Sequence, residues 1–445
     1  MKIFSKHSFF LLASLAAYYF LAYHASREHI ETFFMVYVVL FASFFGYWKD
    51  IENVKQILFW AVMFRLVFVV ATPAFSDDFY RFLWDGQLLV HGYNPFNHLP
   101  PELMNAQLRQ QIPLSSEIYS HINSLQRSNY TCYPPLNQLF FAIAAFVGGN
   151  NLVANMLVLR AIVFLADIGI ILVGIKILKL TKQPLYRISI FAFNPLVINE
   201  LCGNLHFEGV MMFFLVLGLY AMLRDRNALA SILLGMTASI KLIPLMIFPL
   251  FMKRKGFVFA LMAGLVFLFL FAPVFFLSPT GNFYKSIFIY FHSFEFNASV
   301  FYLLRAVGFW TVGYDLVGVI GPVLALVSLG LILRTTYRAD AQNFKTFTRA
   351  LLLCFLIYFS FATTVHPWYI VSLLVISVFS GNVTPLAWST VIWLSYYSYG
   401  NPTFTENPWL LVVEYTVMYA FFMAEYTQFG NKIFISLMKL SGFIH

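Results

Sequence analysis

Long runs of apolar residues, with few polar interruptions, dominate the chain. The runs fall near residues 8–24, 33–48, 56–74, 153–178, 188–202, 209–223, 228–252, 257–277, 314–333, 350–363, 367–380, 385–400 and 409–427. A transmembrane β-barrel would instead show alternating strands of about ten residues, and only helices and closed barrels satisfy the backbone in lipid. The pattern therefore predicts an all-α fold in which residues 1–445 form one polytopic bundle of about 11–14 transmembrane helices.

One apolar run is interrupted by a charge. Lys241, followed by Pro244, stands inside the run 228–252. A charge at the bilayer centre costs about 2.5–3.5 kcal/mol on insertion scales. We therefore expect two short helices with Lys241 at the tip between them. Several other runs fall short of the ~20 residues that span a bilayer, and short helices are tolerated where they line a wet cavity.

Two connections are too long to be simple turns. The first covers 75–135 and the second 278–312, and long loops inside a compact protein are usually functional. Within the first loop, good helix-forming residues run from Asp78 to Val90, between a Ser76 cap signal and Gly92. We expect both segments to be external loops, the first of them long and helical.

Composition agrees with the hydrophobic pattern. The 445 residues are 60% hydrophobic and 11% charged, whereas soluble domains average about 45–50% apolar and about 25% charged. This excludes a soluble enzyme, a disordered chain and a disulfide scaffold. Cys132, Cys202 and Cys354 show no metal or redox spacing, so we expect them to be packing residues. The run 8–24 is rich in bulky aromatic residues and is interpreted as a transmembrane helix rather than a signal peptide.

The net charge of +9 indicates membrane orientation rather than nucleic-acid binding, because the chain has no soluble domain with a basic stripe. With the N-terminus in the cytoplasm, 19 of the 28 Lys and Arg residues fall at cytoplasmic ends, seven fall on the other side and two lie within helices. Lys2, Lys432 and Lys439 are among the 19. This topology requires 136–150 to be a re-entrant or interfacial helix. It puts both long loops and most acidic residues on the non-cytoplasmic side.

The first chemical motif follows the third apolar run. If Asp78 opens a helix, Asp78, Arg81 and Asp85 share one face. A carboxylate at a helix start can act as a general base or hold a cation. The alternative is structural: Asp77 and Asp78 cap the helix and form a surface salt bridge with Arg81.

The second motif lies at the edge of an apolar run. The side chains of Glu200, His206 and Glu208 raise the free energy of membrane insertion there unless they are hydrated or paired. The spacing of His206 and Glu208 resembles a metal pair, but two ligands are too few for a protein-bound metal.

Two further motifs each allow two interpretations. Lys241 between two short helices could bind an anion such as a phosphate, or it could extend its ammonium to the membrane interface. His366 precedes Pro367 at a predicted helix start. Trp368 and Tyr369 then form either an interfacial aromatic belt or a platform for sugar or lipid.

Taken together and in this order, the motifs resemble those of a known family. They are Asp-Asp-x-Tyr-Arg-x-x-Trp-Asp-Gly at 77–86, Gly-x-Asn-Pro at 92–95, His-x-Glu-Gly at 206–209, Lys-x-x-Pro-Leu at 241–245 and His-Pro-Trp-Tyr at 366–369. The combination is similar to the bacterial polyprenol-phosphate-mannose-dependent mannosyltransferases of the GT-C superfamily. The resemblance covers roughly residues 75–370, and no motif matches after about residue 380.

The resemblance implies a reaction and a role for each motif. A GT-C enzyme takes a sugar from a polyprenyl-phosphate donor on the non-cytoplasmic side, typically with inversion. Asp78 would be the general base, with Asp77 as the alternative. The residues implied to bind the donor phosphate are Lys241, His366 and Arg81. Those implied to bind sugar or acceptor are His206, Glu208, Glu200, Asp85, Trp368 and Tyr369, and Arg81 and Asp85 would also shape the first-loop helix.

The resemblance also implies the setting of the reaction. The sugar would be mannose and the acceptor a glycan, glycolipid or protein hydroxyl, with membrane lipids around the protein and no nucleic-acid partner. The enzyme would sit in a bacterial inner membrane with its site facing the periplasm or exterior. The first loops lack a clear Asp-x-Asp, so no cofactor is expected and metal independence is favoured over a divalent ion. The alternative class is a transporter or flippase, in which Arg160 and Asp167, seven residues apart, could mark a transport path or simply pair.

Overall fold

The computed structural model describes residues 6–49, 51, 53–278, 281–401 and 403–427. Three of the basic residues used to predict the topology, Lys2, Lys432 and Lys439, lie outside these residues. Within the described chain the regular elements are all helical, apart from an isolated parallel bridge between Phe296 and Thr364. The predicted all-α polytopic bundle is confirmed.

The helices, with η marking 3₁₀ or π geometry, follow one another along the described part of the chain. They are α1 (Lys6–Tyr23), η1 (Arg27–His29), α2 (Ile30–Tyr47), α3 (Val54–Leu66), α4 (Asp78–Val90), α5 (Pro100–Leu103), α6 (Ala106–Gln111), α7 (Ser115–His121), α8 (Ser124–Arg127), α9 (Pro135–Gly148), α10 (Leu152–Leu180), η2 (Leu185–Ile188), α11 (Ser189–Ala192), α12 (Pro195–Ile198), η3 (Asn199–Gly203) and α13 (Glu208–Leu223). They continue with α14 (Asn227–Ile240), η4 (Ile243–Ile247), α15 (Phe248–Lys255), α16 (Phe257–Leu277), α17 (Asn282–His292), α18 (Val300–Val312), α19 (Val317–Arg338), α20 (Phe344–Phe361), η5 (Pro367–Tyr369), α21 (Ile370–Ser380), α22 (Thr384–Ser389), η6 (Ile392–Gly400) and α23 (Pro408–Tyr426).

Five described helices are long and apolar enough to cross a bilayer. They are Arg27–Tyr47, Leu152–Leu180, Phe257–Phe276, Val317–Arg338 and Phe344–Phe361. Pro195–Gly203 and Glu208–Leu223 together have the length of a sixth span, but the chain bends by 113° between them. Other apolar helices, such as α14, are shorter, as expected of helices that line a cavity inside a bundle.

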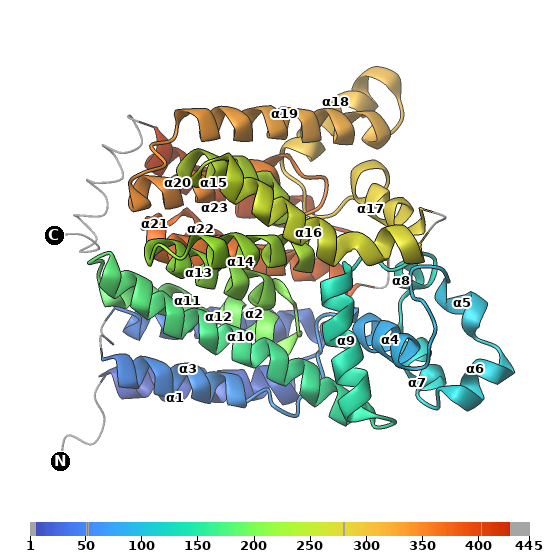
Figure 1. Cartoon of the computed structure of the whole chain (residues 1–445). Helices are drawn as coiled ribbons and strands as arrows, with labels where there is room; N and C mark the ends of the chain where they lie inside the picture. The colour runs from blue at the N-terminus through green and yellow to red at the C-terminus, as the bar shows by residue number, and fades with distance from the viewer. Residues whose placement is uncertain (1–5, 50, 52, 279–280, 402, 428–445) are drawn as a thin grey trace, which may run out of the picture.

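Helix α9 differs from the long helices in direction. In Figure 1, α1, α3, α10 and α19 run in nearly the same direction, whereas α9 crosses it at one end of the bundle. Pro135 opens α9, and the helix packs against α4 and α10. This orientation suits the interfacial helix that the predicted topology requires for 136–150. Helix α4 and the short helices of the first long loop lie at the same end (Figure 1).

Helix α4 has the bounds that the sequence predicts. Ser76 Oγ accepts a hydrogen bond from the Asp78 N–H at 3.3 Å, which satisfies one of the free donors at the helix start. Gly86 brings α4 close to α9, because a Cβ at this position would lie 2.3 Å from the carbonyl oxygen of Phe141. Asp78 therefore stands on a rigid element that packs against its neighbour.

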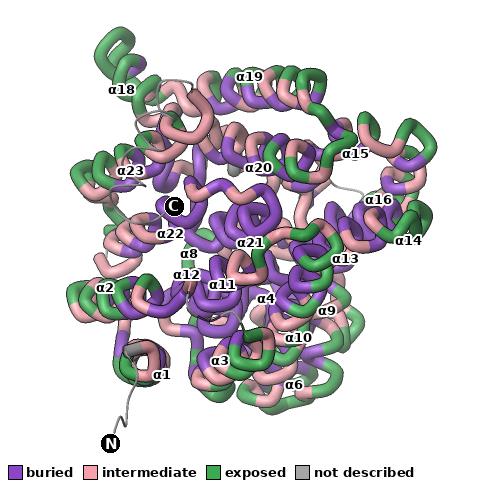
Figure 2. Tube along the Cα trace, turned by 90° about the vertical axis from the view of Figure 1, so that its left-hand side faces the viewer, coloured by how far each residue is buried: buried purple, intermediate pink, exposed green. Residues whose placement is uncertain are grey.

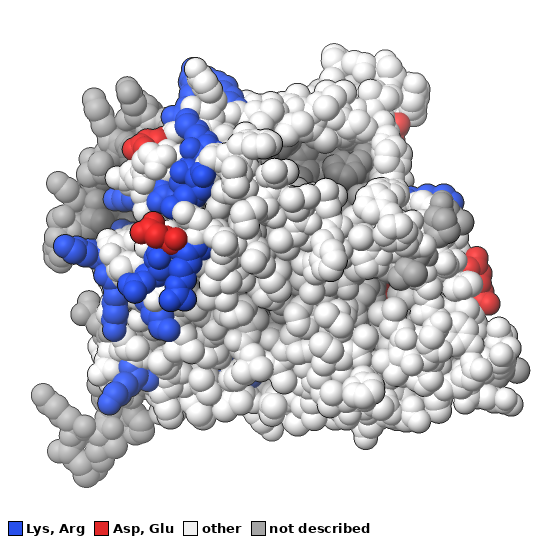
Figure 3. All heavy atoms as spheres, viewed as in Figure 1, with Lys and Arg blue, Asp and Glu red and all other residues white. Residues whose placement is uncertain are grey.

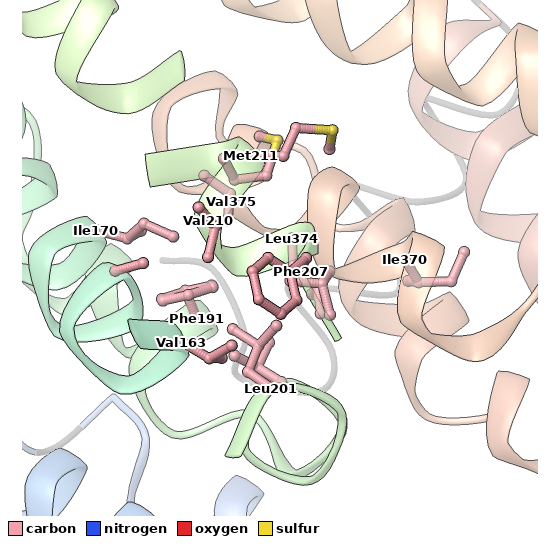
Figure 4. Close-up of a cluster of buried hydrophobic side chains, with 14 of the residues drawn as sticks. Val163, Ile170, Phe191, Leu201, Phe207, Val210, Met211, Ile370, Leu374 and Val375 are labelled. Carbon is pink, nitrogen blue, oxygen red and sulfur yellow. The ribbon is translucent and has the colours of Figure 1, made fainter. Parts of the chain in front are cut away.

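The core surrounds an irregular segment in the middle of the bundle, residues 185–207, in which short helices alternate with non-helical turns. Figure 2 shows that α11, α13 and α21 are largely buried, whereas α18 and α19 carry many exposed residues. Within the core, Phe191, Leu201 and Phe207 of the irregular segment gather with Ile170 of α10 and Leu374 of α21 (Figure 4). Interlocked apolar packing of this kind holds a non-helical backbone in place.

Buried charges within the bundle are satisfied by partners on other segments of the chain. Arg65 of α3 contacts Asp167 of α10 through two hydrogen bonds, at 2.6 and 2.9 Å. Arg160 instead donates to the carbonyl oxygens of Val69, Ala71 and Cys202. Asp167 therefore pairs across the bundle with an arginine of a neighbouring helix, and Arg160 is satisfied by backbone carbonyl groups of other segments.

The second long segment, 278–312, is largely helical rather than extended. It contains α17 and α18, and α17 packs against α19. Figure 3 shows Lys and Arg gathered at the end of the molecule where α10, α15 and α19 end, whereas few charged side chains appear elsewhere on this face. The helices of both long segments lie toward the opposite end (Figure 1).

Candidate active site

A cavity of about 860 Å³ opens among segments that are far apart in the sequence. Its walls come from the residues before α4, the segment 123–134, the break after α14, and the segment around η5. Seven of the site residues predicted from sequence line it, namely Asp77, Asp78, Arg81, Lys241, His366, Trp368 and Tyr369.

Asp78 presents a partly buried carboxylate to this cavity. Its Oδ1 accepts a hydrogen bond from Gln126 Nε2 at 2.9 Å. Burial raises the pKa of Asp78 from 3.8 to about 6; Asp77 adds to the rise, while Lys241 and the Gln126 hydrogen bond oppose it. A carboxylate with a pKa near the working pH is well suited to general base catalysis.

Asp77 has a different environment from its neighbour. Both of its carboxylate oxygens contact the Arg27 guanidinium, one of them at 2.9 Å. A bidentate pair of this kind holds both partners in a fixed geometry. Arg27 comes from η1, near the start of the described chain, so the contact ties η1 to the start of α4.

The contacts of Arg81 are those of a structural residue. Its Nε donates to Asp85 at 2.9 Å, and its Nη1 donates to the carbonyl oxygens of Gln126 and Asn129 at 2.7 and 3.0 Å. Arg81 therefore holds the segment carrying Gln126 onto α4, and three of its five donors are already used. Asp85 also accepts from Gln138 Nε2 at 2.8 Å and does not line the cavity.

Lys241 stands where α14 ends, as predicted, and is followed by η4. Its ammonium forms an ion pair with Glu208 Oε1 and lies 5.7 Å from the centre of the Tyr369 ring. An ammonium has three donors, so the contact with Glu208 leaves two. Lys241 lines the cavity, whereas Glu208 is buried behind it.

His366 lines the cavity at the start of η5, the helix start that the sequence predicts. Its ring stacks on Trp368 with 4.3 Å between ring centres, and its Nδ1 lies 3.0 Å from the Tyr399 hydroxyl. Burial lowers the pKa of His366 to about 3, and the charge of Lys241 acts in the same direction. The imidazole is therefore neutral.

Four residues expected to bind sugar or acceptor do not line the cavity: Asp85, Glu200, His206 and Glu208. His206 stacks behind Trp368, with 3.8 Å between ring centres. Glu200 accepts hydrogen bonds from Tyr396 Oη at 2.7 Å and from Asn204 Nδ2 at 3.0 Å. Glu200 and His206 are buried behind the cavity wall and support it.

The cavity has an apolar part as well as a polar part. Its apolar walls come from η4, α17, α19 and α20 and include Leu242, Met246, Ile287, Leu329 and Phe361. In Figure 3 the surface is hollowed between the regions that Figure 1 labels α16 and α19. A ligand with a polar head and a long apolar chain fits this division.

Comparison with known proteins assigns the chain to a protein family. Residues 12–254 match the family model described as alpha-(1->6)-mannopyranosyltransferase, N-terminal domain. The chain belongs to this family. It is 26% identical over 196 residues to alpha-(1->6)-mannopyranosyltransferase A of Corynebacterium glutamicum. The aligned region covers 43% of this chain and 36% of the relative. The chain is 26% identical over 178 residues to the protein of that name from Mycobacterium tuberculosis, covering 39% and 32%. The matched region thus spans about a third of each curated relative.

The part that matches this mannosyltransferase family contains about half of the residues that line the cavity. Asp77, Asp78 and Lys241 lie within 12–254, whereas His366 and Tyr399 lie beyond it. The predicted resemblance to membrane mannosyltransferases is confirmed.

Several cavity residues of this family member escaped the sequence analysis. Arg27, Gln126 and Tyr399 belong to no motif, and the only available signal was that Gln126 lies within a long polar loop. Cys132 was expected to be a packing residue, but it lines the cavity; Cys202 and Cys354 are buried as expected.

Proposed function

We propose that the protein is a membrane mannosyltransferase that transfers mannose from a polyprenyl-phosphate donor to an acceptor hydroxyl. The observation that carries the proposal is the cavity that joins a partly buried carboxylate, Asp78, to a cation, Lys241, and to an apolar arm. The acceptor would be a glycan, a glycolipid or a protein side chain.

The shape of the cavity supports a lipid-borne donor. The apolar walls from α17, α19 and α20 suit an isoprenoid chain, since apolar ligands bind in apolar clefts. The phosphate would then lie near Lys241, which lines the cavity and keeps two N–H donors beyond its contact with Glu208. Phosphate is a ligand that lysine binds well as a point charge.

The reaction would be a single displacement. Asp78 removes the proton of the acceptor hydroxyl, and the acceptor oxygen forms a bond with the anomeric carbon of mannose. The bond from that carbon to the phosphate oxygen breaks, and its electron pair leaves with the lipid phosphate. Lys241 stabilises the charge that develops there. One displacement inverts the anomeric centre, so an α linkage, which the names of the relatives specify, requires a β-linked donor.

Contacts favour Asp78 over Asp77 as the base. Both oxygens of Asp77 are engaged by Arg27, whereas Asp78 has one hydrogen bond, from Gln126, among the described residues. A base needs a free oxygen within hydrogen-bond reach of the hydroxyl. Asp77 would instead help to set the charge around Asp78.

The distribution of charge supports a site on the non-cytoplasmic side. Basic side chains gather where α10, α15 and α19 end (Figure 3), and basic ends of membrane helices face the cytoplasm. The helices of the first long segment lie toward the opposite end. In a bacterial inner membrane this orientation would place the site at the periplasmic or outer face.

The transporter alternative rested on charges inside the bundle. Arg65, Asp167 and Arg160 all have hydrogen-bond partners within the protein. Because their hydrogen bonds are satisfied within the protein, the presence of these charges is explained by a structural role. The structure adds no observation that favours transport.

The experiment is a transfer assay with purified protein in liposomes, using polyprenyl-phosphate-mannose and a simple mannoside acceptor. Asp78→Asn should lower the rate by about 10²–10⁴-fold, the contribution of a general base. Asp225→Asn is the matched control: Asp225 is exposed, does not line the cavity, and has a positive φ that Asn tolerates. Full activity of Asp78→Asn would refute the base. Movement of the lipid without any glycosidic product would favour a flippase.

A further inference from the structure

Tyr399 is one of the cavity residues that belong to no sequence motif. It lies near the end of η6, lines the cavity, and places its hydroxyl 3.0 Å from Nδ1 of His366. The two residues come from different segments, so the contact is a tertiary one. It joins the C-terminal part of the described chain to the start of η5.

The His366 ring is held in its plane by other aromatic rings. It is nearly parallel to the rings of Trp368, at 4.3 Å and 7°, and Phe296, at 4.9 Å and 27°. Hydrogen bonds between Phe296 and the backbone of Thr363 and Val365 fix the same segment. Stacking restricts the plane of an imidazole, but it does not determine which nitrogen carries the proton.

The hydrogen bond from Tyr399 can decide that question. A neutral imidazole has one N–H donor and one bare nitrogen, and the partner of one nitrogen determines the state of the other. Among the described residues, Nε2 of His366 has no hydrogen-bond partner, and His366 lines the cavity. If Tyr399 donates to Nδ1, the proton must lie on Nε2.

We propose that Tyr399 is a positioning residue: its O–H donates to Nδ1 of His366 and thereby directs an Nε2–H donor into the cavity. This inference rests on the proposed function, in which the ligand carries an anionic phosphate. The Nε2–H group would donate to a phosphate oxygen of the lipid donor, and it would complement Lys241. The opposite tautomer would present a lone pair to an anion.

A double-mutant cycle tests the proposal. Tyr399→Phe keeps the ring and removes only the hydroxyl, so it should lower kcat/KM for the lipid donor by about tenfold, the effect of losing a hydrogen bond worth about 1.4 kcal/mol. In His366→Gln, the amide supplies a donor near the position of Nε2 without a tautomer to choose. Tyr399→Phe should therefore have almost no effect in the His366→Gln background. Equal losses in both backgrounds would overturn the proposal.

Tyr397→Phe is the matched control, because Tyr397 lies on the same helix and does not line the cavity. It should leave kcat/KM unchanged, and a loss equal to that of Tyr399→Phe would also overturn the proposal. If Tyr399 had only a structural role, Tyr399→Phe would lower the melting temperature, and its effect on kcat/KM would not depend on His366.

A second measurement does not depend on activity. In protein labelled with ¹⁵N at the histidine rings, the signals of His366 are those lost in His366→Gln. Nε2 should resonate as a protonated nitrogen and Nδ1 as an unprotonated one, and Tyr399→Phe should mix the two tautomers. A protonated Nδ1 in the unmodified protein would overturn the proposal. If the tautomer is as expected but no mannose donor gives product, the proposed function fails rather than the positioning role.

Discussion

The pH dependence of transfer is the sharpest test of the base, because burial raises the pKa of Asp78 from 3.8 to about 6. A general base works only in its deprotonated form, so the rate should rise with pH through about 6 and then level off. A group with a pKa of about 6 is about 90% deprotonated at pH 7 and about 10% at pH 5, which gives a rate ratio of about ten. An unshifted carboxyl would lose less than about a tenth of the rate over the same range.

Two substitutions should move this midpoint in opposite directions. Asp77→Asn removes a negative charge that raises the pKa of Asp78, so the midpoint should move to lower pH. Gln126→Leu removes a hydrogen bond that stabilises the charged carboxylate, so the midpoint should move to higher pH. Neither substitution removes the base itself, and both variants should retain the rising limb.

The assay is kcat/KM for the mannosyl lipid, measured between about pH 4.5 and 8 with constant ionic strength, since this parameter reports groups of the free enzyme. Asp225→Asn should reproduce the unmodified profile. The reasoning is refuted if the rate falls with rising pH, if the midpoint stays below about 4.5, or if Asp78→Asn keeps the same limb at reduced amplitude. Shifts of equal sign in Asp77→Asn and Gln126→Leu would refute the electrostatic account.

Two further predictions concern sidedness and stability. A membrane-impermeant maleimide should label Cys132 from the non-cytoplasmic side and block transfer, because Cys132 lines the cavity and the other two cysteines are buried; labelling from the cytoplasmic side alone would reverse the topology. Arg65→Met should destabilise the protein by about 3–5 kcal/mol, because it leaves Asp167 charged and unpaired in the bundle. The double variant Arg65→Met/Asp167→Leu should recover most of this loss in thermal unfolding, and a double variant as unstable as the single one would contradict the ion-pair account.

Local features of the site were predictable because short-range chemistry determines them. The bounds of α4 follow from Ser76 before it and Gly92 after it, and the break at Lys241 follows from the cost of a charge within an apolar run. The start of η5 after His366 follows from Pro367. Each prediction needed only neighbouring residues.

Contacts between distant segments were not predictable in this way. Arg65 pairs with Asp167 across two helices, and Tyr399 meets His366 from another part of the chain. The position of Glu208 behind Lys241, rather than in the cavity, depends on the bend before α13. No local pattern encodes these distances, because tertiary packing sets them.

One element was missed although its signal was present. In α17, the positions Phe283, Ser286 and Ile287 recur at the three- and four-residue spacing of a helix face. Phe283 and Ser286 are buried, and Ser286 and Ile287 line the cavity. The length of the segment and the predicted topology indicate an external loop, whereas its periodicity adds that this loop contains a helix.

The depth of the site follows from helices that stop short. Helix α14 has 14 residues, which at 1.5 Å per residue is about 21 Å against a hydrocarbon core of about 30 Å. The shortfall of about 9 Å leaves Lys241 where water can reach it, and the same reasoning applies to His366 before η5. Non-helical backbone is tolerated at membrane depth only where it is buried in protein or lines a wet cavity. Interrupted or short apolar runs that carry a charge at one end therefore indicate the site more directly than the identity of any single motif residue does.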